Sequence, residues 1–207
     1  RFDDYPILPF GDPGDVAYTR LVDLTFDTAA VMDEIADLTT NSGRDQPESQ
    51  LVALFQASTG TGQDLSGEGY PEASIPAGQN ANFRDGVTKL FLLWTDAPFH
   101  RRDDGGGIPY PGPTFVEVVE AIEALDPPQV IGISSGGGGL EDLEAIASAT
   151  GAFAPEGGVD CDANGSIDIA AGEPIVCEIA ASGEGIADAI VSVVEAAVAA
   201  ATPMAVC

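Results

Sequence analysis

The pattern of apolar positions along the chain predicts both strands and helices. Residues 87–95 (VTKLFLLWT) and 130–134 (VIGIS) are almost continuously apolar, which is typical of strands covered on both faces in a parallel sheet. Elsewhere the apolar residues recur at helical spacing between glycine- or proline-containing breaks, and this spacing predicts helices. The expected helices are a segment capped by Asp27, a segment that starts at Pro47 and stops at Gly60, and residues 114–125, 140–150 and 185–201.

Two further segments predict shorter strands. Residues 16–24 show a patchy alternation suited to an edge strand, and residues 174–179 form a short apolar run. Strand and helix alternate through the second half of the chain, which indicates an α/β fold with a mainly parallel sheet. We expect a single domain over residues 1–207, with a glycine-rich surface excursion at 60–82 and an acidic insertion at 155–177.

The chain is strongly acidic. Its 207 residues include 34 Asp and Glu but only 7 Lys and Arg, so the formal net charge is -27 at pH 7. This charge repels phosphates and therefore argues against nucleic acid and anionic membrane surfaces as partners. With 44% hydrophobic residues the chain can still bury a core, and no apolar run approaches the roughly 20 residues of a membrane span.

The cysteines indicate an oxidising compartment. Cys161 and Cys177 are close enough in sequence to close a small loop, whereas Cys207 is left over from this pairing. The sequence begins at Arg1 without an initiator methionine or a signal peptide, in what reads as the end of a strand. We therefore expect a secreted or cell-surface protein, with a segment removed upstream.

Three acidic residues are candidate metal ligands: two lie near the start of a helix and one follows a buried strand. Asp45 and Glu48 lie at the junction between a loop and the helix that starts at Pro47, and Asp96 follows the strand at 87–95. Ligands bind at the carboxyl ends of strands in open α/β sheets, and hard divalent cations prefer oxygens from several loops. The spacing leaves an alternative open, in which Asp45 and Glu48 complement a helix N-terminus and Asp96 caps a turn.

A second candidate is the segment DCDANGSID at residues 160–168. It follows the pattern of a calcium-binding loop, with oxygen-bearing residues at alternate positions, a glycine for the bend and an aliphatic residue, Ile167, to anchor the loop. The position of the usual bidentate glutamate is Ala171, and Glu173 is a substitute two residues later. An Asx-rich turn without a cation is the alternative. The expected calcium ligands are Asp160, Asp162, Asn164, Ser166 and Asp168.

Several segments, in this order, resemble von Willebrand factor A (VWA) domains of the integrin β-subunit variety and their bacterial relatives. The segments are YPILPF (5–10), LVDLTFDTAAV (21–31), DQPE (45–48), FRDGVTKL (83–90), TDAPFH (95–100), VIGIS (130–134), LEDLEAIASATGA (140–152) and GIADAIV (185–191). The resemblance covers most of the chain. It implies a Rossmann-like open sheet with helices on both faces, and a divalent cation above the sheet that binds an acidic group of a protein ligand.

By this resemblance, Glu48 and Asp96 are ligands of the main cation, usually Mg²⁺, and Asp45 with the Pro47 carbonyl serves an adjacent Ca²⁺. The family's Asp-x-Ser-x-Ser loop and the central strand before it have no counterpart here. The nearest match, DLSGE at 64–68, follows a glycine-rich stretch and is interpreted as surface loop. We therefore expect the first central strand to come from upstream in a longer polypeptide or from another chain.

An enzymatic function is not expected. The segment GISSG at 132–136 has the form of a nucleophile elbow, but the single histidine, His100, precedes Ser134 rather than following it. His100 is interpreted as a structural hydrogen-bonding residue, and Phe91 and Trp94 as core. The expected function is an extracellular, cation-dependent protein-binding or adhesion domain. The alternative is a structural subunit of an extracellular filament or other surface assembly, stabilised by Ca²⁺ and a donated strand that links copies.

Overall fold

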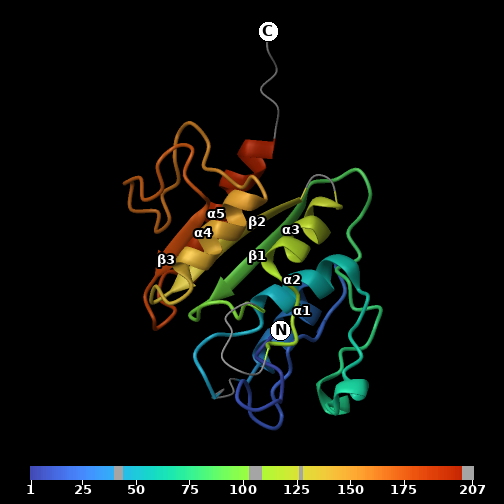
Figure 1. Ribbon diagram of the computed structural model, residues 1–207. Helices are drawn as coiled ribbons and strands as arrows, with labels where there is room; N and C mark the ends of the chain where they lie inside the picture. Colours follow the sequence, from blue (N-terminus) through green and yellow to red (C-terminus); the bar gives the residue numbers. More distant parts are fainter. Residues whose placement is uncertain (40–43, 103–108, 126–127, 202–207) are drawn as a thin grey trace. The chain divides into compact units, whose positions relative to one another are not determined.

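The computed structural model describes residues 1–39, 44–102, 109–125 and 128–201. By their internal contacts the residues form two compact units (Figure 1). Unit 1 comprises Arg1–Asp85 and Phe99–Ala121, and unit 2 comprises Gly86–Pro98 and Ile122–Cys207. Cys207 lies outside the described residues.

Unit 2 is built on a parallel sheet. Its strands are β1 (Lys89–Thr95), β2 (Pro128–Ser135) and β3 (Val176–Ile179), in the order β1-β2-β3. Both pairings are parallel, with Gly132 of β2 opposite Leu93 on one side and Val176 on the other. The expected α/β class with a parallel sheet is therefore confirmed for the described residues.

Two helices pack on this sheet, α4 (Leu140–Ala149) and α5 (Ile186–Ala201), and both contact β2 and β3. Val130 and Ile131 point to opposite faces of β2 because they are neighbours in a strand, and both are fully buried. Both faces of β2 are thus covered. A Cβ at Gly132 would lie 3.1 Å from Leu143, so glycine there lets α4 approach the sheet closely.

Strand β1 is less covered than the sequence predicts. Leu93 is buried, but Leu92 is 38% exposed and Trp94 is 49% exposed. The expectation that both faces of this strand are covered, with Trp94 in the core, is wrong. The reason is its position: β1 is an edge of the described sheet, and α4 and α5 pack mainly on β2 and β3.

The helices of unit 1 follow the expected pattern with shifted ends. Helix α1 (Thr28–Ala36) starts where Asp27 caps the first turn, its carboxylate accepting the backbone N–H groups of residues 29 and 30. Helix α2 (Gln50–Thr59) starts three residues after Pro47 and ends at Gly60, which has φ +62°. The short 3₁₀ helices are η1 (Ser66–Glu68) and η2 (Pro71–Ala73), and α3 (Phe115–Glu123) runs from unit 1 into unit 2 along the chain.

The core of unit 1 is aromatic and aliphatic. Its buried members are Tyr5, Ile7, Phe10, Ala17, Tyr18, Val52, Ala53, Leu65, Ala73, Ile75 and Tyr110. Three of these come from the glycine-rich excursion at 60–82, where the backbone of Gln63 pairs with that of Ile75. This segment therefore helps to form the core of unit 1.

Residues 16–24 do not form the expected strand. The Asp3 N–H donates to the Val16 carbonyl and the Thr19 N–H donates to the Arg1 carbonyl, both at 2.9 Å. The pairing does not continue at Tyr5, the next residue that faces this segment, because its N–H donates to the Asp4 carboxylate instead.

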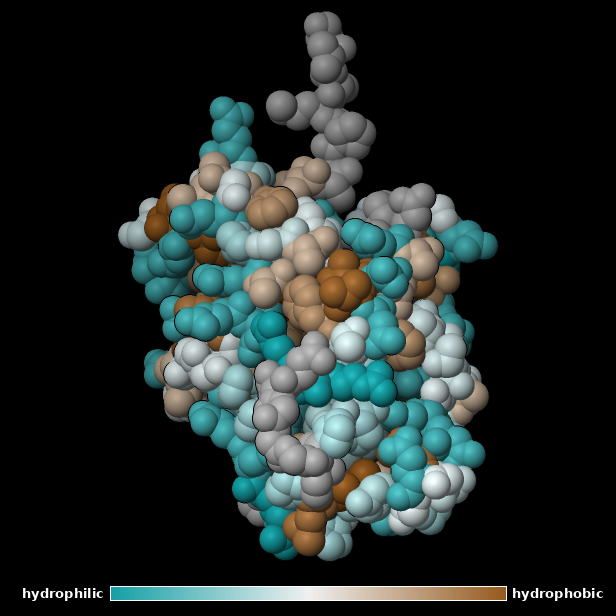
Figure 2. Space-filling model, in the orientation of Figure 1, coloured by the Kyte–Doolittle hydropathy of each residue, from teal (hydrophilic) through white to brown (hydrophobic). Residues whose placement is uncertain are grey.

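The surface is largely hydrophilic, as one face of the molecule shows, with small apolar groups between the polar side chains (Figure 2). Among the described residues, no helix has the length and hydrophobicity needed to cross a membrane.

Candidate metal sites

A disulfide fastens the acidic loop of unit 2 to the sheet. Cys161 bonds to Cys177 of β3, with 5.7 Å between their Cα atoms, which confirms the pairing expected from the sequence. The base of the loop is closed by an antiparallel bridge between Val159 and Ile169, and both of these side chains are buried. The segment 160–168 is therefore held at both ends.

Three carboxylates meet inside this loop. One ligand oxygen from each of Asp160, Asp162 and Asp168 lies within 4.8 Å of the others. Backbone N–H groups orient two of them: Gly165 donates to Asp160 at 2.7 Å and Cys161 donates to Asp168 at 2.8 Å. The chain bends back through Gly165, at φ +92°, which glycine adopts without strain.

Asn164 and Ser166 lie beside these carboxylates. The Asn164 side-chain amide donates to Asp162 Oδ2 at 2.8 Å, while its oxygen accepts the backbone N–H of Ser166 at 2.8 Å. A cation that used the Asn164 oxygen would have to displace this contact. Ile167, the aliphatic residue expected to anchor the loop, is 57% exposed, so that expectation is wrong; Ile169 is the buried one, because it pairs with Val159 at the base.

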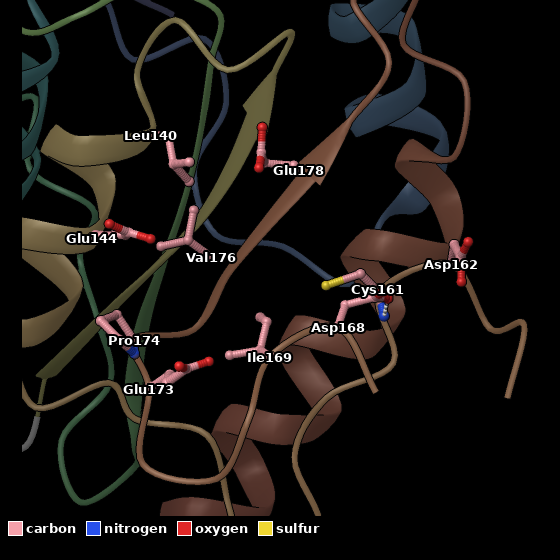
Figure 3. Close-up of a pocket in the computed structure, with 10 residues that line it drawn as sticks. All are labelled: Leu140, Glu144, Cys161, Asp162, Asp168, Ile169, Glu173, Pro174, Val176 and Glu178. Atoms are coloured by element: carbon pink, nitrogen blue, oxygen red, sulfur yellow. Dashed lines mark hydrogen bonds between the residues drawn. The ribbon is translucent and has the colours of Figure 1, made fainter. Parts of the chain in front are cut away.

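The loop borders an acidic cavity of about 470 Å³ (Figure 3). Its lining residues are Leu140, Glu144, Cys161, Asp162, Asp168, Ile169, Glu173, Pro174, Val176 and Glu178. Glu173 accepts the Ala170 N–H at 2.9 Å and is not part of the three-carboxylate group. In Figure 3, Ile169 lies between Glu173 and Asp168. Five carboxylates and no basic side chain line the cavity among the described residues, so its field favours cations.

The other predicted ligands are divided between the units. Glu48 belongs to unit 1, where its carbonyl accepts the His100 N–H at 2.9 Å and its carboxylate Oε2 is buried without a hydrogen-bond donor among the described residues. Burial, reinforced by the nearby Asp4 and Asp3 carboxylates, raises the pKa of Glu48 to about 8. Asp96 is exposed and belongs to unit 2. The convergence of Glu48 and Asp96 on one cation stays a prediction.

Asp45 is the third predicted ligand, and it lies beside a buried pair that the sequence analysis missed. Its Oδ1 is 3.3 Å from His100 Nε2, and the same nitrogen is 2.9 Å from Asp4 Oδ2. Burial opposes protonation of the ring, but the two carboxylates outweigh it and raise the pKa of His100 above its usual value. Nothing in the local sequence marks Asp4 as a site residue, because it lies in an irregular segment. The single histidine among 34 carboxylates is the feature that could have led to this pair.

No family model matches this chain, and a search of curated proteins finds no match.

Proposed function

We propose that the chain is an extracellular, non-enzymatic, VWA-like domain that binds divalent cations and, through them, a protein partner. The observation that carries the proposal is the disulfide-anchored loop in which Asp160, Asp162 and Asp168 bring their oxygens within 4.8 Å of one another. Oxygens on opposite sides of Ca²⁺ are about 5 Å apart, because each lies about 2.3–2.6 Å from the ion. The spacing of the three carboxylates therefore suits Ca²⁺.

Two further observations support the extracellular and non-enzymatic parts of the proposal. A disulfide is typical of an oxidising compartment. Ser134, the serine of the elbow-like segment, is fully buried, and its hydroxyl has no hydrogen-bond partner among the described residues. A buried serine without a base beside it is a poor nucleophile for an external substrate.

The partner-binding step rests on the resemblance to VWA domains. In this proposal Glu48 and Asp96 hold Mg²⁺, Asp45 supports a neighbouring Ca²⁺, and an acidic group of the partner completes the Mg²⁺ coordination. The loop at 160–168 holds a structural Ca²⁺ in unit 2. Partner capture that is lost both in EDTA and in Asp96→Ala would support this division of roles; capture that survives both would contradict it.

The structural Ca²⁺ is tested by thermal unfolding. We expect Ca²⁺ to raise the Tm of the chelator-treated protein, and we expect the double substitution Asp160→Asn with Asp162→Asn to abolish this rise. Asp33→Asn is the matched control, because it removes an exposed carboxylate from α1 at a distance in sequence from the loop. A Tm that Ca²⁺ leaves unchanged would contradict the calcium site.

A second function, the structural subunit of an extracellular assembly, is favoured by the surface of α1. This helix buries none of its residues, and Met32 and Ile35 are 63% and 55% exposed. Apolar residues on one exposed helix are typical of a surface that another chain covers. Self-assembly that is lost in Met32→Gln with Ile35→Gln, but retained in Val116→Gln, would support this function; Val116 is similarly exposed on α3.

A further inference from the structure

We infer that Asp4, Asp45 and His100 form a second metal site, selective for a transition-metal ion of the Zn²⁺ type. All three residues belong to unit 1, and the inference is independent of the calcium loop in unit 2. One ligand atom from each of them lies within 4.8 Å of the others.

The spacing of the ligand atoms is that of a small coordination sphere. Zn²⁺ binds nitrogen and oxygen at about 2.0–2.2 Å in tetrahedral geometry, which places neighbouring ligand atoms about 3.3 Å apart. His100 Nε2 is 2.9 Å from Asp4 Oδ2 and 3.3 Å from Asp45 Oδ1. The two distances from the imidazole nitrogen therefore match this geometry to within a few tenths of an ångström, and the Asp4 and Asp45 oxygens lie within 4.8 Å of each other.

Asp4 supplies the observation that points to a ligand. Its side chain is almost completely buried, and its Oδ1 accepts hydrogen bonds from the Tyr110 hydroxyl at 2.9 Å and the Tyr5 N–H at 2.6 Å. Its Oδ2 is also buried and forms an ion pair with His100 Nε2 at 2.9 Å, but it accepts no aligned hydrogen bond from the described residues, because the hydrogen bond of that nitrogen is made with Asp45. The hydrogen-bonding capacity of this buried oxygen is therefore incompletely used, and a cation bound between Asp4 and His100 would satisfy it directly.

The surrounding residues fix the imidazole in place. The Tyr110 ring stacks on His100 with centroids 4.1 Å apart, and the Phe10 ring meets it edge-on at 5.2 Å. The His100 N–H donates to the Glu48 carbonyl, so the backbone is held as well. A ligand that is already oriented loses little conformational entropy on binding. Asp45, with a side chain 34% exposed, provides the route to solvent and the side for a fourth ligand.

The donor set distinguishes this site from a calcium or magnesium site. Ca²⁺ takes six to eight oxygens and Mg²⁺ requires octahedral oxygen geometry, whereas an imidazole nitrogen with two carboxylates suits Zn²⁺ and its neighbours in the first transition row. The Ca²⁺ expected at Asp45 from the VWA resemblance would share this ligand, so the two ions compete there.

The test is calorimetric titration of the chelator-treated full chain with Zn²⁺ in excess Ca²⁺, in a Cys207→Ser background that removes the third cysteine as a ligand. We expect one Zn²⁺ per chain. Asp45→Asn should weaken binding by more than about tenfold, the lower end of the cost of losing even an outer-sphere partner. His100→Gln should abolish it. Asp64→Asn, which removes a fully exposed carboxylate of unit 1, should change nothing.

Three outcomes would overturn the inference. The first is no Zn²⁺ binding in excess Ca²⁺, and the second is equal affinity in Asp45→Asn, Asp64→Asn and the parent protein. The third comes from nitrogen NMR of the His100 ring, where protonation of both ring nitrogens at neutral pH with Zn²⁺ present would show that a proton occupies the position between Asp4 and Asp45. Asp45→Asn is the decisive variant if His100→Gln fails to fold, because Asp45 is partly exposed. The double substitution Asp160→Asn with Asp162→Asn should remove the stabilisation by Ca²⁺. It should leave Zn²⁺ binding unchanged.

Discussion

At the scale of single residues, the buried carboxylate of Glu48 couples folding to pH. In the folded protein, burial and the nearby Asp4 and Asp3 carboxylates disfavour the charged form of Glu48 and raise its pKa to about 8. In the unfolded chain the same group releases its proton near its usual value of 4.5. Its contribution to stability is therefore present below pH 4.5 and is lost as the pH rises to about 8.

Glu48→Gln removes this titration, so we expect the Tm of the chelator-treated variant to fall less than that of the parent between pH 5 and pH 9. At pH 9 the variant should be the more stable of the two, because a buried charge is no longer required. Thermal unfolding across this range measures the difference. Glu72→Gln, at an exposed carboxylate, is the control, and a pH profile of Glu48→Gln that parallels it would show that Glu48 ionises normally.

Residue patterns in the sequence predicted contacts within one loop better than contacts between distant segments. The Cys161–Cys177 pairing and the clustering of Asp160, Asp162 and Asp168 follow from short spacings, because a nine-residue loop that bends at a glycine must bring alternate side chains together. The proximity of Asp4 to His100 was not predictable in this way. It joins positions 96 residues apart, and nothing in the local pattern at Asp4 signals burial.

At the scale of elements, periodicity predicted the type of most helices and strands but not what covers them. Strands β1, β2 and β3 and helices α4 and α5 lie close to their expected residues. The apolar run of β1 predicted cover on both faces, yet Trp94 is half exposed, because burial depends on neighbours that the run itself does not specify. The same holds for α1, whose apolar residues are all exposed or partly exposed.

The turn after β2 allows a direct test of element packing. A Cβ at Gly138 would lie 2.0 Å from the carbonyl oxygen of Asp96, so glycine is required where this turn meets the end of β1. We expect Gly138→Ala to lower the free energy of unfolding by about 1–3 kcal/mol, as other overpacking changes do. Gly157→Ala, where the added Cβ meets nothing within 4 Å, is the matched control in unit 2. Equal stability of both variants in denaturant unfolding would contradict the close approach.

The disulfide between the acidic loop and β3 has a consequence for cation binding. Joining residues 16 apart stabilises the folded chain by about 3 kcal/mol, through restriction of the unfolded state. We expect Cys161→Ser with Cys177→Ser to lose about this much stability and also to bind Ca²⁺ more weakly, because the ends of the loop become free to separate. Denaturant unfolding and Ca²⁺ titration measure the two effects. Cys207→Ser is the control, and unchanged Ca²⁺ affinity in the double variant would separate the disulfide from the cation site.

At the scale of the whole molecule, the charge of -27 opposes the compact state. With 34 acidic residues and 7 basic ones, the basic side chains are too few to pair with most of the carboxylates. Simple salt relieves this repulsion by screening, since the Debye length falls from about 10 Å at 0.1 M to about 3 Å at 1 M. A bound cation acts differently, because it neutralises particular carboxylates at concentrations too low to screen the rest.

These two effects can be separated by comparing NaCl with CaCl₂. We expect the Tm of the chelator-treated protein to rise steadily with NaCl up to 1 M, because screening reduces repulsion over the whole surface. Millimolar CaCl₂ should raise the Tm further at low ionic strength, and this second rise should vanish in Asp160→Asn with Asp162→Asn while the response to NaCl persists. If the double variant instead keeps its Ca²⁺ response, Ca²⁺ acts on the general acidic surface. If the parent shows no NaCl response, repulsion among the carboxylates is not a term in its stability, and the acidic composition serves solubility alone.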